Sequence, residues 1–183
     1  MLNNTLQQYL LIFKSTNVMI KELLVGEFLQ EAEKTRKLLT AIPDSMLDFK
    51  PSESSWTTAQ LASHIAEVYN WYDGTLNANV LDMAEYRYDK GDVSKSANIL
   101  AKFEENFLKA KSGFENFDET TIMTPWEMKM GEQVLVPSTP KIHIVRGFLM
   151  NHLYHHRGEM IIYFRLTGNK TPGLYGPTAD DKR

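Results

Sequence analysis

Apolar residues recur at three- and four-residue intervals over four long segments of the chain, a pattern typical of amphipathic helices. The first predicted helix covers residues 18–42, where a following proline discourages further helix. The second begins after a cap at Thr57 or Thr58, whose side chain can accept from free backbone amides, and continues to about Leu76. The third covers about residues 94–117 and is strongly amphipathic.

The fourth predicted helix has the clearest boundary signals. Ser138 or Thr139 is the expected cap, and Pro140 suits the first turn because its missing N–H needs no partner there. The apolar periodicity then continues to Leu166, and Gly168 is the expected stop.

The remaining segments show no helical period. Residues 118–137 contain short apolar stretches around Gly131, which predict a small hairpin or an irregular insert. Residues 1–17 are interpreted as a tail or an extra helical turn. Because the length suits one core, we expect an all-α chain that forms a single helical-bundle domain over residues 1–183.

Composition excludes several classes of function. A net charge of −3 and the absence of a Lys/Arg cluster disfavour nucleic-acid binding. Without cysteine the chain has no thiolate ligand or cysteine nucleophile, so any thiol chemistry needs a thiol brought by a substrate. No apolar stretch approaches the ~20 residues of a membrane span, and no signal peptide is recognised. We therefore expect a cytoplasmic protein with no nucleic-acid or membrane partner.

Three histidines lie on predicted core-facing stripes. His152 and His156 are four residues apart on the fourth helix, and His64 lies on the apolar stripe of the second. Imidazoles one helical turn apart can converge on one divalent ion at ~2.0–2.1 Å. The alternative is that all three are hydrogen-bonded core residues, in which every unsatisfied ring nitrogen costs about 1–3 kcal/mol.

Other polar residues surround this predicted cluster. His155 is a competing ligand that lies off the stripe, whereas His143 falls on the opposite side of the helix and is expected at the surface. Glu159 lies in the stripe and could be a fourth ligand, a partner of a ligand, a general base, or an exposed carboxylate at the rim. Arg157 is assigned to a structural salt bridge or to a contact with a neighbouring helix, and not to substrate. Aromatic residues that could line a pocket are Trp71, for which ordinary packing is favoured, Tyr163 and Tyr175.

Two blocks of sequence resemble the DinB family of DinB/YfiT-like metalloenzymes. The first is EAEKTRKLLTAIPDSMLDFKPSESSWTTAQLASHIAE, and the second is NHLYHHRGEMIIYFRLTGNKTPGLYG. With the spacing between them, the resemblance covers about residues 27–176. It implies an up-and-down four-helix bundle with a long crossover, often dimeric, that holds nickel, zinc or a similar ion through three histidines.

Carried over to this chain, the family's ligands fall on His64, His152 and His156. The chain departs from the family at Glu159, where glutamine is common, and a carboxylate there would add negative charge near the ion. Zinc and nickel are the expected ions, with iron, manganese and copper as alternatives.

Three histidine ligands leave a coordination position for water or substrate, as in a catalytic site. One mechanism, suggested by family members, transfers a low-molecular-weight thiol to an electrophilic small molecule. Another hydrolyses small amides or esters, with Glu159 as proton shuttle. A third hypothesis is a non-catalytic metal-binding or dimerisation module. The expected partners are thus a small-molecule substrate and a second copy of the chain.

Overall fold

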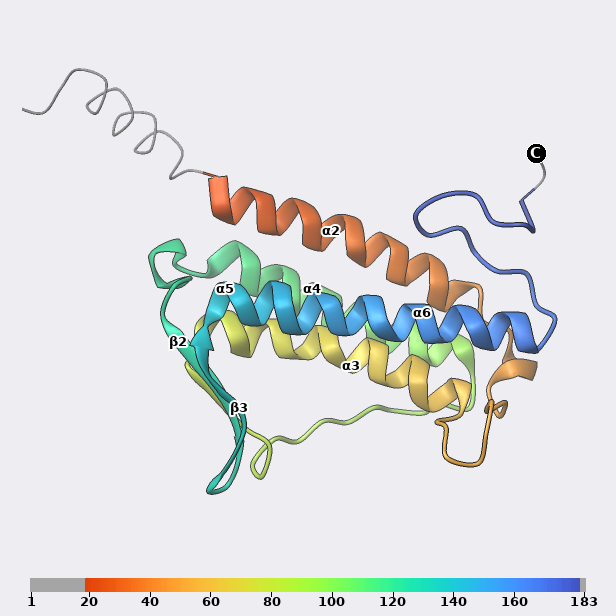
Figure 1. Ribbon diagram of the computed structural model, residues 1–183, viewed down its shortest axis with the longest axis horizontal. Helices are drawn as coiled ribbons and strands as arrows, with labels where there is room; N and C mark the ends of the chain where they lie inside the picture. The colour runs from red at the N-terminus through yellow and green to blue at the C-terminus, as the bar shows by residue number, and fades with distance from the viewer. Residues whose placement is uncertain (1–18, 182–183) are drawn as a thin grey trace, which may run out of the picture.

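The computed structural model describes residues 19–181, in which four long helices lie beside a small sheet (Figure 1). The long helices are α2 (Met19–Thr40), α3 (Thr58–Asn77), α4 (Ser96–Asn116) and α6 (Asn151–Leu166). Short 3₁₀ helices are formed by Asp44–Met46 and Glu119–Thr121. The mostly helical character is confirmed, and the expectation for residues 1–17 lies outside the described residues.

A capping box starts α3 at the predicted place. The Thr57 hydroxyl accepts a hydrogen bond from the Gln60 backbone N–H at 3.2 Å, and the Gln60 side chain accepts from the Thr57 backbone N–H at 2.8 Å. This reciprocal pair satisfies two amides that the first turn leaves free. It fixes the start of α3, and therefore the position of His64 within that helix.

The expectation of an all-α chain is confirmed only in part, because three strands form a small mixed sheet in the order β1-β2-β3 beside the helices. Strands β2 (Pro125–Met130) and β3 (Gln133–Pro140) form an antiparallel hairpin, so part of the predicted insert is indeed a hairpin. Gly131 adopts a φ of +59° at its turn, a conformation that suits glycine. Strand β1 (Val80–Asp82) pairs in parallel with β2.

A long connection links α3 to α4. After β1 the chain runs back along the length of α3 before α4 begins, so these two helices run in the same direction (Figure 1). Tyr86 and Tyr88 lie on this crossover segment, and both side chains are partly buried. The crossover therefore places these two aromatic side chains against α3 and α4.

The last predicted helix is divided into three parts. A single turn, α5 (Lys141–His143), leads into a π-helical segment, Ile144–Met150, and α6 follows directly. Pro140 precedes the first turn as the last residue of β3, and no side chain caps that turn, so the expected cap at Ser138 or Thr139 was wrong. A hairpin strand that continues into the helix leaves those two residues in extended backbone.

The end of α6 agrees with the sequence prediction. Gly168 has a φ of +70°, and its N–H donates to the carbonyl of Arg165 at 3.2 Å. The N–H of Asn169 donates to the carbonyl of Phe164 at 3.0 Å. These two bonds form a Schellman cap, in which glycine tolerates the left-handed backbone.

One close contact between α3 and α4 supplies a stability test. A Cβ added at Gly113 would lie 2.9 Å from the Cα of Asp73, a backbone atom that moves only with α3. We expect Gly113→Ala to lower the free energy of unfolding by about 1–2 kcal/mol, because the overlap exceeds the gain in helix propensity. Urea unfolding measures this value.

The matched control is Gly74→Ala, also in a helix but with nothing within 4 Å of the added Cβ. This variant should be more stable than the wild type by about 0.5–1 kcal/mol. Equal stabilisation by both substitutions would show that the two helices do not approach closely at Gly113.

Among the described residues, no helix combines the length and apolar character that crossing a membrane requires.

Candidate metal centre

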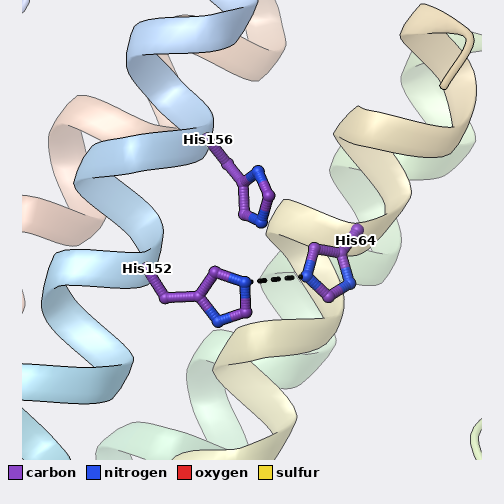
Figure 2. Close-up of side chains that lie close together, drawn as sticks. All are labelled: His64, His152 and His156. Atoms are coloured by element: carbon purple, nitrogen blue, oxygen red, sulfur yellow. Dashed lines mark hydrogen bonds between the residues drawn. The ribbon is translucent and has the colours of Figure 1, made fainter. Parts of the chain in front are cut away.

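The three predicted histidines meet between α3 and α6. His64 projects from α3 and His152 and His156 project from α6, and their rings point toward one another (Figure 2). The Nε2 atoms of His64 and His152 are 3.2 Å apart. The ring of His156 lies 4.8 Å from that of His64 and 4.5 Å from that of His152, centroid to centroid. One ring nitrogen from each residue lies within 4.8 Å of the others.

Two buried nitrogens in this cluster have no hydrogen-bond partner among the described residues. They are Nε2 of His156 and Nδ1 of His152. Leaving such atoms unsatisfied costs about 1–3 kcal/mol each. An ion bound between the rings would satisfy Nε2 of His156, whereas His152 faces His64 with Nε2 and keeps its Nδ1 outside the shared position. Two nitrogens at ~2.0–2.1 Å from one tetrahedral ion lie roughly 3.3 Å apart. The observed 3.2 Å between His64 and His152 therefore fits a shared ion.

The electrostatic environment favours neutral imidazoles. Burial, together with a smaller effect of the neighbouring histidines, lowers the pKa of His152 to about 4. Burial also lowers the pKa of His156, against the opposing effect of the Glu159 carboxylate. Because a metal binds only the deprotonated nitrogen, His152 and His156 need not lose a proton at neutral pH before they bind an ion.

Carboxylates contact the outer nitrogens of two histidines. The Nδ1–H of His156 donates to Oε2 of Glu159 at 2.6 Å, and Oε1 of Glu159 lies 3.2 Å from Nε2 of His155. Nδ1 of His64 lies 3.5 Å from Oε2 of Glu67. Such a partner fixes the tautomer of a histidine ligand, so that the opposite nitrogen is free to bind an ion. Sequence reasoning missed Glu67, although it has the same three-residue spacing from a histidine as Glu159.

Comparison with known families identifies the family of the chain. The sequence model of the DinB family matches residues 13–182, nearly the whole chain. The chain belongs to the DinB family. Its relatives include the uncharacterised protein YrdA of Bacillus subtilis, which is 25% identical over 154 residues, 82% of this chain and 85% of YrdA.

Solved DinB structures share the fold. A DinB-like protein from Bacillus cereus superposes with a TM-score of 0.63 at 19% identity, over 83% of this chain and 95% of its own. The DinB-like protein YjoA from Bacillus subtilis gives a TM-score of 0.66 at 16% identity, over 82% and 96%. At these identities the likeness concerns the fold alone.

Not every residue weighed from the sequence joins the cluster of this DinB protein. His155 has a side chain 64% exposed and approaches the cluster through Glu159, and His143 is exposed as predicted. The Trp71 ring packs 5.9 Å from both His64 and His152. Tyr175 contacts Arg157 and Glu31 instead of the histidines, so its placement at the pocket was wrong.

Trp56 is the aromatic residue that sequence reasoning missed. Its ring lies 5.0 Å from that of His64 and 5.8 Å from that of His156, and the residue is 46% exposed. The available signal was its position directly before the Thr57 cap, where an apolar residue commonly folds over the first helical turn. The indole therefore covers the histidines on their solvent side.

Two cavities reach the histidines. One, of about 430 Å³, includes His64 in its wall, and the other, of about 340 Å³, includes His156 and Glu159. Trp56 belongs to both walls. Small molecules thus have two routes to the cluster.

The Glu159 contact leads to a prediction on metal affinity. We expect Glu159→Ala to weaken zinc binding by about 10–100-fold, because the tautomer and orientation of His156 lose their support. Glu159→Gln keeps an acceptor oxygen for the Nδ1–H of His156 and should lose less. Competition with a chromophoric chelator measures both dissociation constants. Equal affinities of wild type and Glu159→Ala would mean that Glu159 does not orient this ligand.

Proposed function

We propose that this DinB protein is a metal-dependent enzyme that transfers a low-molecular-weight thiol to an electrophilic small molecule. The observation that carries the proposal is the meeting of three imidazoles at a point reached by two separate cavities. A transfer between two organic molecules needs room for both beside the same centre. Hydrolysis needs room for one organic molecule and a water.

His64, His152 and His156 would hold the ion, with zinc or nickel as the proposed metal and iron or manganese as alternatives. When bound, a divalent ion with an open position favours the deprotonated form of a sulfhydryl or water beside it. Trp56 and Trp71 pack against the ring of His64. The ligand set thus suits a nucleophile generated at neutral pH.

Glu159 is positioned to manage the proton of the reaction. Its carboxylate lines the smaller cavity, so it can take the proton released from the thiol. The exposed His155 beside Oε1 of Glu159 can pass that proton to solvent. The sulfur then forms a bond to the electrophilic carbon, and the leaving group departs with the electron pair of the bond that breaks. No oxidant or reductant is required.

Four further expectations remain proposals. The homodimer and the up-and-down four-helix bundle follow from the family resemblance. The single domain over residues 1–183 and the cytoplasmic location follow from length and composition. Light scattering coupled to size-exclusion chromatography tests the dimer, since it gives the mass in solution directly.

A turnover assay tests the proposed activity. Protein loaded with zinc or nickel is mixed with a panel of small thiols and chlorodinitrobenzene, and thioether formation is followed with and without a chelator. We expect turnover that chelation abolishes. Cleavage of para-nitrophenyl acetate without thioether formation would replace the proposal with a hydrolase. No turnover, with chelation lowering only the melting temperature, would leave a non-catalytic metal-binding module.

A further inference from the structure

Trp56 forms a wall common to the two cavities that reach the histidines. Its ring contacts that of His64, which lines the larger cavity, and that of His156, which lines the smaller cavity. The remaining walls differ: the larger cavity is bordered by the crossover segment, and the smaller by the loop before α3 and by α6. The two spaces are therefore chemically distinct although they share a centre.

Two nearly parallel aromatic rings line the larger cavity. Tyr86 and Tyr88 lie with ring planes 7° apart, and both line it. Their hydroxyl groups are held in place: that of Tyr86 accepts from the indole N–H of Trp71 at 2.9 Å, and that of Tyr88 from the Asn106 amide at 2.8 Å. Lys90 and Glu67 also line this cavity. The Glu67 carboxylate lies 3.5 Å from Nδ1 of His64, whereas none of the described ion pairs involves Lys90, the one Lys or Arg among the described lining residues. Aromatic walls beside an ammonium group favour a planar anion.

The smaller cavity differs from the larger one in charge. Its lining includes the hydroxyl-bearing residues Ser54, Ser55 and Tyr163, together with the Glu159 carboxylate. None of its described lining residues is a Lys or Arg. Hydroxyl groups recognise hydroxyl or amino substituents, whereas the carboxylate repels an anionic ligand. This space suits a small polar molecule that is neutral or cationic.

On these grounds, and resting on the proposed thiol transfer, we propose that Trp56 separates two substrate subsites. The larger cavity binds a flat electrophile that bears an anionic group, and the smaller binds a hydroxyl- or amine-bearing thiol. For a chloronitrobenzoate the sulfur–carbon bond forms and the carbon–chlorine bond breaks. Chloride leaves with the electron pair, and the thiol proton goes to Glu159 and then to solvent.

Two matched substitutions test the separation. Val93→Phe places a new ring in the larger cavity, and Ser54→Phe places the same ring in the smaller one. With chloronitrobenzoate and thioglycerol, we expect Val93→Phe to raise the KM of the electrophile by roughly tenfold or more, with the KM of the thiol changed less than about twofold. Ser54→Phe should instead raise the KM of the thiol by roughly tenfold or more and change the KM of the electrophile less than about twofold. A parallel rise of both KM values in either variant would overturn the proposal.

Charge supplies a second arm of the experiment. Lys90→Met should raise the KM of chloronitrobenzoate by about two- to fivefold and leave that of its methyl ester unchanged, because the loss is one exposed ion pair. In the wild type, thioglycerol should be a better substrate than thiomalate, whose two carboxylates would face Glu159. A preference for thiomalate contradicts the assignment of the smaller cavity.

A binding measurement separates this inference from the proposed function. Meta-nitrobenzoate lacks a leaving group, so its binding to metal-loaded protein is measured by calorimetry without turnover. We expect binding that Val93→Phe removes and Ser54→Phe retains. If that pattern appears without any thiol transfer, the anion subsite stands and the proposed function fails. If thiol transfer occurs but the two variants bind meta-nitrobenzoate equally, the proposed function stands and the anion subsite fails.

Discussion

Replacing any one of His64, His152 and His156 with alanine is expected to abolish stoichiometric binding of zinc or nickel. Each substitution removes one of three nitrogens that converge on the same point, so the loss should exceed the 10–100-fold expected for an outer partner. Elemental analysis after dialysis against a weak chelator measures the metal content. The melting temperature should rise with added metal in the wild type and not in the variants, because only a binding-competent fold is stabilised.

The matched controls are the two remaining histidines of the chain. His155→Ala removes the imidazole that lies between His152 and His156 in the sequence. His143→Ala removes an exposed imidazole in α5. Both variants should retain the metal content of the wild type. A variant of His64 that keeps full stoichiometry, or a His155 variant that loses it, would redraw the ligand set.

The second large effect concerns Arg157, which is 1% exposed. Its guanidinium donates to the carboxylate of Glu31, to the backbone carbonyl of Glu31 at 2.8 Å, and to the hydroxyl of Tyr175 at 2.6 Å. Burial raises the pKa of Glu31, but hydrogen bonds from Lys34, Tyr175 and Arg157 outweigh it and hold the pKa below its ordinary value. Arg157→Met removes the buried cation and leaves Lys34 as the ion-pair partner of this carboxylate, so we expect a loss of about 3 kcal/mol in the free energy of unfolding.

Urea unfolding of three variants checks this prediction. The double variant Arg157→Met/Glu31→Met should lose less than the sum of the single variants, because it removes the buried carboxylate together with its buried cation. Arg165→Met breaks the more exposed pair with Asp180 and should change stability by about 0–1 kcal/mol. A loss for Arg157→Met no larger than that for Arg165→Met would show that the buried pair contributes little.

The sign of the pH dependence follows from the lowered pKa of Glu31. A carboxyl group whose pKa is lower in the folded state stabilises the fold above its ordinary pKa, and this contribution disappears as the pH falls through the folded value. The wild type should therefore lose more stability on acidification than the double variant.

Local signals in the sequence predicted the helices well. The α3 cap and the α6 stop depend on residues within one turn of each other, such as Thr57 with Gln60, so they can be recognised without tertiary structure. Strand β1 was missed because its three residues pair with residues 127–129, far along the chain. The π-helical segment 144–150 was missed because its wider hydrogen-bonding turn is set by packing, not by a residue pattern.

The candidate site also contains residues that local sequence signals predicted and residues that they did not. Helical periodicity placed His64, His152 and His156 on inward faces, and the structure brings them together. The crossover residues Tyr86 and Tyr88 were not predicted, because their positions depend on side-chain hydrogen bonds to other elements and not on a period in the sequence.

X-ray absorption spectroscopy of the zinc-loaded wild type tests the central claim most directly, because it reports the atoms bound to the ion. The structure predicts three imidazole nitrogens at about 2.0–2.1 Å, with the multiple-scattering signal of the rings, and a remaining lighter-atom ligand from solvent. A spectrum dominated by oxygen ligands, or one that fits a single imidazole, would contradict a metal centre built from His64, His152 and His156.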